Sequence, residues 1–144
     1  HLFSMKEKQR LVLGEFLNSE VMNFNEPAEG VVRYNMTYAL DLLGSLKGRV
    51  LLNLDSSLAH AVAAILFASE TGVSDEDMHV AMQELLNIFG GHLVTAFNEL
   101  GHDLDIATPE RSDEDFMTAQ ATRRILFRFS CLGRIIQFVV LLKN

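Results

Sequence analysis

One stretch, from Ser74 to Gly101, has the pattern of a single long amphipathic helix, and a helix of this length needs a large apolar surface to pack on. Ser74 is suited to cap its N-terminus, residues 75–77 place negative charge at the positive end of the helix dipole, and Gly101 is a typical stop. The pattern therefore predicts one buried face. Its apolar side chains recur at intervals of three and four residues: Met78, Met82, Leu85, Phe89, Leu93, Phe97 and Leu100.

A second set of residues lies on the other side of this predicted helix. Successive residues of an α-helix are rotated by about 100°, so Glu84, Asn87 and Gly91 share one face, and we call these three residues the outward row. Gly90 and Gly91 together should cost about 2 kcal/mol relative to alanine in a helix interior. The bare backbone indicates that another helix or a partner protein approaches closely there.

Composition limits the number of domains and the compartment. A chain of 144 residues that is 49% hydrophobic fits one domain, residues 1–144, in which residues 1–4, ahead of Met5, have the appearance of an expression remnant. The single cysteine, Cys131, lies in an apolar run and is interpreted as core filling, which favours a reducing cytoplasm. No stretch has the pattern of a signal peptide or the length of a membrane span, so secretion and membrane insertion are not expected.

The charge distribution indicates the kind of partner. The formal net charge of −7 argues against nucleic acid, because phosphate contacts need clustered Lys and Arg. No lysine or arginine occurs between Arg49 and Arg111, while ten acidic residues fall inside this interval. The surface around the long helix is therefore predicted to be acidic and to attract a positively charged group of a partner.

The remaining patterns predict an α+β domain. We expect a mostly antiparallel sheet of about five to six strands, with two long antiparallel helices and an N-terminal helix packed on it. The apolar strand from Ile135 to Leu142 is interpreted as an exposed edge that favours a homodimer. The predicted elements are a helix from Ser4 (its cap) to Asn18, an edge strand over 21–24, a turn over 25–30, strands over 31–42 and 50–54 around a hairpin loop at 44–48, a helix from Ser57 to Glu70 capped by Asp55 or Ser56, a short strand over 102–108 ended by Pro109, a loose loop over 110–120, and strands over 122–131 and 134–143.

Known catalytic motifs are missing from the sequence. The histidines are scattered without zinc-site spacing, so no metal site is expected, and no nucleophile elbow, Walker loop or dinucleotide fingerprint occurs. This leaves Glu84 and Asn87, for which a solvated helix face is the ordinary interpretation. The same ExxN spacing recurs at Glu15/Asn18 and Glu20/Asn23, but only the copy on the long helix is followed by the glycine gap.

The run from Glu84 to Gly91, ELLNIFGG, resembles the E-x-x-N-x-x-x-G signature of the CheC/CheX/FliY chemotaxis phosphatases. The hairpin at 44–50, the alanine-rich helix after Asp55-Ser56, and the segment 101–109 are similar to CheX in order and spacing. The resemblance spans roughly Val31 to the C-terminus. One signature helix, in place of the two found in CheC-type members, is similar to the CheX arrangement.

The resemblance implies that this chain is a hydrolase that dephosphorylates the aspartyl-phosphate of a CheY-like response regulator. In the family, the carboxylate at the position of Glu84 engages the regulator's active-site lysine, and the amide at the position of Asn87 orients the attacking water. Mg²⁺ belongs to the regulator, and no cofactor is expected in this chain. Gln83, Gly90 and Gly91 are the expected partner contacts, and a homodimer formed by sheet continuation is implied.

Elementary chemistry agrees with these roles. Phosphoryl transfer needs an in-line water and neutralised charge more than covalent help. An amide such as Asn87 can position a water but is a poor base, and the acidic stretch supplies no cation. A partner protein that brings its own lysine and metal would supply the missing positive charge. The alternative is a non-catalytic docking module that binds a response regulator or a motor component through the same face.

Overall fold

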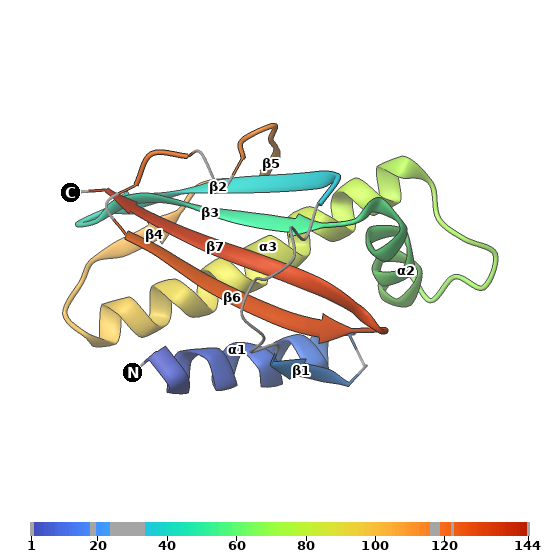
Figure 1. The fold of residues 1–144 in the computed structure, drawn as a ribbon, viewed down its shortest axis with the longest axis horizontal. Helices are drawn as coiled ribbons and strands as arrows, with labels where there is room; N and C mark the ends of the chain where they lie inside the picture. The colour runs from blue at the N-terminus through green and yellow to red at the C-terminus, as the bar shows by residue number, and fades with distance from the viewer. Residues whose placement is uncertain (1, 18–19, 24–33, 116–118, 122, 144) are drawn as a thin grey trace.

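The computed structural model describes residues 2–17, 20–23, 34–115, 119–121 and 123–143. These residues form a curled antiparallel sheet with helices against it (Figure 1), so the predicted α+β class is confirmed. The elements are α1 (Leu2–Leu17), β1 (Val21–Asn23), β2 (Met36–Gly44), β3 (Lys47–Leu54), α2 (Ser56–Leu66), α3 (Asp75–Glu99), β4 (Leu104–Ile106), β5 (Glu110–Arg111), β6 (Arg123–Cys131) and β7 (Arg134–Lys143).

The sheet has seven strands in the described part of the chain, against the five to six expected. Its strand order is β1-β6-β7-β3-β2-β4, every pairing is antiparallel, and β5 pairs with β2 beside β4. The additional strand is β5, in which Glu110 pairs with Ala39 and Arg111 pairs with Tyr38. These two residues were assigned to a loose loop, because two paired residues are too few to produce an alternating pattern.

Alternate residues of the central strands build the main core. β2 lies within the strand predicted over 31–42, and every second residue of it, Met36, Tyr38, Leu40 and Leu42, is buried. All three helices contribute to the same apolar cluster. The ring of Phe89 in α3 stacks on Phe138 of β7 with ring centroids 3.9 Å apart.

Strand β7 is not an edge, and the interpretation of Ile135 to Leu142 as an exposed edge is wrong. β7 lies between β6 and β3, and seven consecutive residues from Ile136 to Leu142 are buried. The opposite face of the sheet carries a smaller apolar cluster, covered by Ala119. The strand is apolar on nearly every residue because both of its faces are covered. The second cluster comprises Ala39, Leu51, Ala119, Val139 and Leu141.

The two shorter helices differ from their predicted bounds. Helix α1 begins at Leu2, so Ser4 lies inside it and does not cap it. Helix α2 ends at Leu66 and not at Glu70, and with 11 residues it is too short to be the second long helix expected. It lies past one end of the sheet (Figure 1). The left-handed residue that follows this helix is Ala68, with a φ of +50°. Gly72 lies four residues further on and does not end the helix.

Part of the predicted first long strand and its turn fall outside the described residues, namely 31–33 and 25–30, as does Asn18. β2 begins at Met36. Just before it, Asn35 Oδ1 accepts a hydrogen bond of 2.7 Å from the backbone N–H of Ser56, the first residue of α2. Asp55 holds the N-cap position of α2 but makes no side-chain capping bond, so Asn35 supplies the acceptor instead.

Cys131 is buried, and burial raises the pKa of its thiol, which agrees with its interpretation as core filling. None of the described helices combines the length and the apolarity that crossing a membrane requires.

The two adjacent glycines of α3 meet different surroundings. A Cβ atom at Gly90 would lie 3.0 Å from Leu40 Cδ2 and 3.4 Å from Ile106 Cδ1, whereas a Cβ at Gly91 would meet nothing within 4 Å. The close neighbour at Gly90 is therefore the sheet, through β2 and β4. The open space beside the helix lies at Gly91 alone.

This difference predicts opposite responses to the same substitution. Gly90→Val should lower the free energy of unfolding by about 1–3 kcal/mol, because the added methyl groups press on the buried side chains of the sheet. Gly91→Val should change it by less than about 0.5 kcal/mol, because the site is open and valine is no worse than glycine in a helix. Urea unfolding of both variants measures the difference, and equal stabilities would contradict the packing role of Gly90.

Candidate functional site

Both ends of α3 are held by side-chain or backbone hydrogen bonds. The Ser74 hydroxyl oxygen accepts a bond of 3.1 Å from the backbone N–H of Asp77, as the predicted cap requires. At the other end Gly101 has a φ of +96°, and the N–H groups of Gly101 and His102 donate to the carbonyls of Asn98 and Phe97. This is a Schellman motif, so the predicted stop at Gly101 is confirmed.

The buried stripe fixes how α3 is rotated on the sheet. Met78, Met82, Leu85, Phe89 and Leu93 are at most 5% exposed. Phe97 is only partly buried, and Leu100 is 53% exposed, so the prediction that the stripe continues to Leu100 is wrong. The helix extends beyond the sheet at this end, and Leu100 is already the C-cap residue.

The outward row faces solvent. Glu84 and Asn87 are exposed, and Gly91 is half-buried with open space at its missing Cβ. Within the described part of the chain, neither the Glu84 carboxylate nor the Asn87 amide has a hydrogen-bond or ion-pair partner. Both side chains are therefore available to a second molecule, and the exposed apolar side chain of Val80 lies one turn before Glu84.

Gln83 ties α3 to the segment that follows β4. Its Nε2 donates a bond of 2.8 Å to the carbonyl oxygen of Pro109, and the residue is half-buried. The structure thus gives Gln83 an internal partner next to Glu84. Its role as a partner contact stays a prediction.

A hollow of about 430 Å³ lies along the N-terminal turns of α3, and we call it the Tyr38 hollow. Tyr38 of β2 is fully buried, and its hydroxyl lies 2.9 Å from His79 Nδ1. The Arg111 guanidinium carbon lies 5.7 Å from the centroid of the Tyr38 ring. Burial raises the pKa of Tyr38 against the opposing effect of Arg111, so the phenol stays protonated at neutral pH. The lining residues are Met36, Tyr38, Ser56, His60, Asp75, Glu76, Met78, His79 and Arg111.

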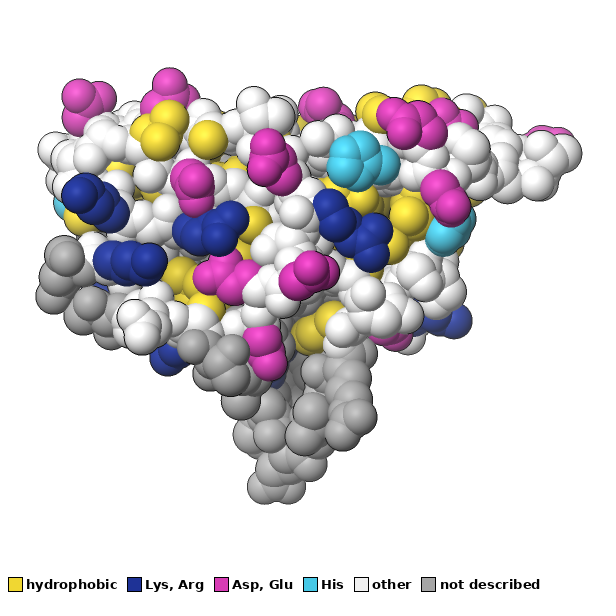
Figure 2. Space-filling model, turned by 90° about the horizontal axis from the view of Figure 1, so that it is seen from above, with side chains coloured by type: hydrophobic (Ala, Val, Ile, Leu, Met, Phe, Trp, Pro, Cys, Tyr) yellow, Lys and Arg dark blue, Asp and Glu magenta, His cyan; other side chains and the backbone are white. Residues whose placement is uncertain are grey.

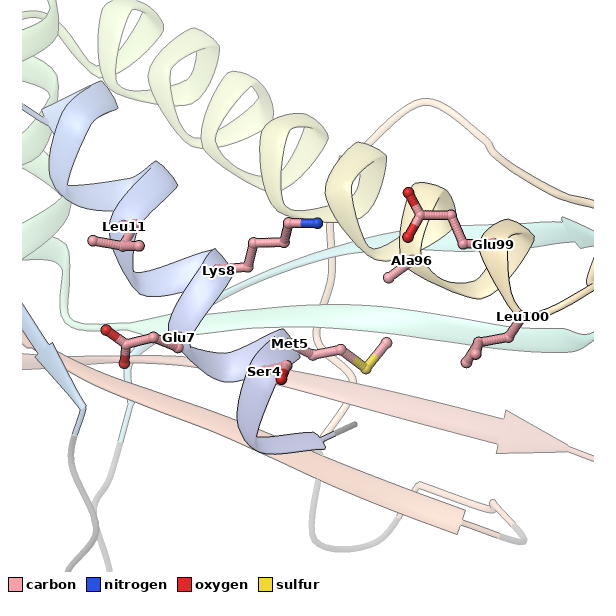
Figure 3. Close-up of a pocket in the computed structure, with 8 residues that line it drawn as sticks. All are labelled: Ser4, Met5, Glu7, Lys8, Leu11, Ala96, Glu99 and Leu100. Atoms are coloured by element: carbon pink, nitrogen blue, oxygen red, sulfur yellow. The ribbon is translucent and has the colours of Figure 1, made fainter.

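A second hollow, of about 590 Å³, lies between α1 and the C-terminal end of α3 (Figure 3). Met5 and Lys8 extend from α1 toward α3, where Ala96 and Leu100 lie (Figure 3). Its lining includes neither Glu84 nor Asn87.

The chemistry available at the outward row is that of a carboxylate and an amide on a rigid helix. Among the residues that the structure describes, no three or more His, Cys, Asp or Glu side chains come together as a metal site. An amide both accepts and donates hydrogen bonds, so Asn87 can orient a water molecule, while Glu84 can pair with a cation. The row can therefore complete the reaction centre of another molecule.

Comparison with known proteins identifies the family. The model described as "Chemotaxis phosphatase CheX" matches residues 36–129, which include β2, β3, α2 and the whole of α3. The chain belongs to this family. The predicted CheX resemblance is thereby confirmed, and no protein among those with curated descriptions matches the chain.

Solved structures of CheX and CheC-like proteins share the fold. A CheX of Borrelia burgdorferi, solved as a complex with CheY, BeF₃ and Mg²⁺, matches with a TM-score of 0.80 and 21% identity over 100% of this chain and 99% of that chain. A CheX of Desulfovibrio desulfuricans matches with a TM-score of 0.79 and 16% identity over 99% of both chains. FliY of Thermotoga maritima matches with a TM-score of 0.64 and 18% identity, over 95% of this chain and 84% of that chain.

The structure of this CheX-family chain brings most, but not all, of the predicted site residues together. Glu84, Asn87 and Gly91 share the exposed face, whereas Gly90 is buried against the sheet. Sequence reasoning missed Arg111 because it lies in a two-residue strand that has no recognisable pattern. Tyr38 falls within the strand predicted over 31–42, and no signal in the sequence relates these two residues to each other.

The separation of the two faces of α3 predicts how substitutions affect folding. Asn87→Ala and Glu84→Ala should each change the free energy of unfolding by less than about 0.5 kcal/mol, because both side chains are exposed and unpartnered. Leu85→Ala, on the buried face beside Glu84, should cost about 2–5 kcal/mol. Chemical denaturation followed by circular dichroism measures these differences, and a large loss at Asn87 would show that its role is structural.

Proposed function

We propose that this chain hydrolyses the aspartyl-phosphate of a CheY-like response regulator. The observation that carries the proposal is the outward row: Glu84 and Asn87 are exposed on a rigid, capped helix and have no partner among the described residues. Membership of the CheX family supports the reaction class. The reaction centre would then be composite, with the regulator supplying the phosphoryl group.

Asn87 is proposed to orient the attacking water. Its carbonyl oxygen accepts a hydrogen bond from the water, and its amide N–H₂ donates to the phosphoryl group or to a second water. A water held in line with the phosphorus–oxygen bond loses less entropy on reaching the transition state, and positioning of this kind is the main help that phosphoryl transfer needs. The open space beside Gly91 leaves room for the regulator's backbone one turn further along.

Glu84 is proposed to pair with the regulator's active-site lysine. The interval between Arg49 and Arg111 contains no lysine or arginine, and acidic residues at the start of α3 add to the negative field. A lysine that approaches this helix meets an unpaired carboxylate, and the pair fixes the distance at which Asn87 enters the site. Mg²⁺ is proposed to reside on the regulator.

The Borrelia burgdorferi relative supports the choice of partner, because that CheX was solved with CheY, BeF₃ and Mg²⁺. We propose that this chain takes a partner of the same class, in the cytoplasm. We also propose a homodimer, as the family resemblance implies. The strands open to a second copy are the outer ones, β1 and β4, because β7 is interior.

Replacement of Asn87 tests the reaction. Asn87→Ala should reduce the acceleration of phosphate loss by at least about a hundredfold while leaving the fold intact, because the water is no longer oriented. The measurement is release of inorganic phosphate from a ³²P-labelled cognate regulator at a catalytic ratio of this chain to regulator. An unchanged rate would remove Asn87 from the mechanism, and a wild-type effect that needs stoichiometric protein would favour the docking module.

Charge reversal tests the lysine contact. Glu84→Lys should raise KM for the phosphorylated regulator by about tenfold or more, because two ammonium groups would meet at the contact. Glu99→Lys is the matched control, since Glu99 is an exposed glutamate in the last turn of the same helix. Steady-state hydrolysis over a range of regulator concentrations separates KM from kcat, and equal KM values for the two variants would overturn the assignment of Glu84.

A further inference from the structure

We infer that Arg111 is a second recognition point for the same regulator and that it takes a carboxylate side chain on the regulator's surface. This inference rests on the proposed function and adds the chemistry by which the partner is selected. Glu84 would meet a cation of the regulator, and Arg111 would meet an anion. The two contacts have opposite charge and lie at different positions beside α3.

Arg111 is held in place by a buried aromatic residue. It pairs with Tyr38 across β5 and β2, and its guanidinium carbon lies 5.7 Å from the centroid of that ring. Tyr38 is fully buried, and its hydroxyl is bonded to His79 of α3. A guanidinium that lies over an aromatic face keeps its planar fork available for a carboxylate, so the side chain loses little further freedom on binding.

Arg111 has no carboxylate partner in the part of the chain that the structure describes, and this distinguishes it from two other arginines. Arg49 pairs with Asp41 at 3.0 Å and with Glu114 at 2.7 Å, and Arg10 pairs with Glu7. The Tyr38 hollow contains two carboxylates, Asp75 and Glu76, but Asp75 lies 3.2 Å from His60 Nε2 and neither carboxylate forms an ion pair with Arg111. Arg111 is thus an exposed, oriented cation whose charge is not matched by an ion pair.

The position of Arg111 relative to the outward row is set by Gln83. Pro109, two residues before Arg111, accepts the hydrogen bond of the Gln83 amide, and Gln83 adjoins Glu84 on α3. His79, which holds Tyr38, lies eight residues before Asn87, or about 12 Å along the helix axis. A single globular partner seated on the outward row would therefore also reach Arg111.

The face seen in Figure 2 has a mixed polar and apolar surface. Basic, acidic and histidine side chains there alternate with small patches of exposed hydrophobic surface. The lining of the Tyr38 hollow has the same mixed character, with Met36 and Met78 beside Arg111 and His79. Two charges of opposite sign flanking such a surface allow only one orientation of the partner, since reversal would place like charges together.

Charge reversal at Arg111 tests the inference. Arg111→Glu should raise KM for the phosphorylated regulator by about tenfold and leave kcat within about twofold, because the contact acts in docking and not at the phosphoryl group. Arg111→Lys should recover only part of the affinity, since lysine keeps the charge but not the fork over Tyr38. The matched control is Arg123→Glu, an exposed arginine on β6 that produces the same change in net charge.

Salt dependence supplies a second readout that a structural role would not move. KM for the regulator should rise with ionic strength in both proteins, but less steeply for Arg111→Gln than for the wild type, because the variant lacks one charge pair that salt can screen. An equal slope in wild type and Arg111→Gln would overturn the inference. So would an Arg111→Glu variant whose KM equals that of Arg123→Glu.

Failure of the proposed hydrolysis can be distinguished from failure of the Arg111 inference. If wild type and Asn87→Ala hydrolyse equally, the reaction is wrong, and the affinity for the BeF₃-loaded regulator with Mg²⁺ then decides the role of Arg111. Binding about tenfold weaker in Arg111→Glu than in Arg123→Glu supports the second recognition point, and equal binding overturns it. Failure of the wild-type chain to bind any cognate regulator would overturn both proposals.

Discussion

The burial of one stripe of α3 against the sheet is the constraint on which the site depends. Leu85, Leu86 and Phe89 are fully buried, and the stacking of Phe89 on Phe138 fixes the helix on the centre of the sheet. Because an α-helix has a fixed rotation per residue, burial of these positions forces Glu84 and Asn87 outward. The hydrophobic effect that folds the chain thus also presents the polar pair, and no loop has to be ordered to expose it. A rotation that hid the pair would have to expose the apolar stripe.

The two adjacent glycines of α3 face different surroundings. Gly90 lets the helix lie near Leu40 and Ile106, and Gly91 leaves the outer surface bare. The cost of about 2 kcal/mol for two glycines in a helix is offset on one side by packing that a side chain at Gly90 would disturb. On the other side no described residue lies within 4 Å of a Cβ at Gly91, so packing among the described residues does not offset its cost.

The sequence was sufficient for the parts of the fold that have long, regular patterns. The caps of α3 at Ser74 and Gly101 and the alternation of β2 follow from local chemistry, and the exposed pair follows from the helical period. Features set by distant contacts were not predictable. The burial of β7 from Ile136 to Leu142 reflects its place between β6 and β3, and the pattern of one strand cannot tell a central position from an exposed edge. Likewise, α2 is followed by Ala68 in the left-handed conformation, and β5 is defined only by its pairing with β2, in which Arg111 lies opposite Tyr38.

Arg111 lies too far from Asn87 to assist the proposed chemistry directly. The Tyr38–His79 pair over which Arg111 lies is about 12 Å along α3 from Asn87, which exceeds the screening length of about 8 Å at physiological ionic strength. If a phosphoryl group is placed beside Asn87 as proposed, its charge has to be neutralised by groups of another molecule. In the proposed function, the chain contributes an amide that orients the water, an acid that attracts a cation, and a distant arginine that acts only in partner selection. Under that proposal an acidic protein can act on an anionic group, because the positive charge arrives with the substrate.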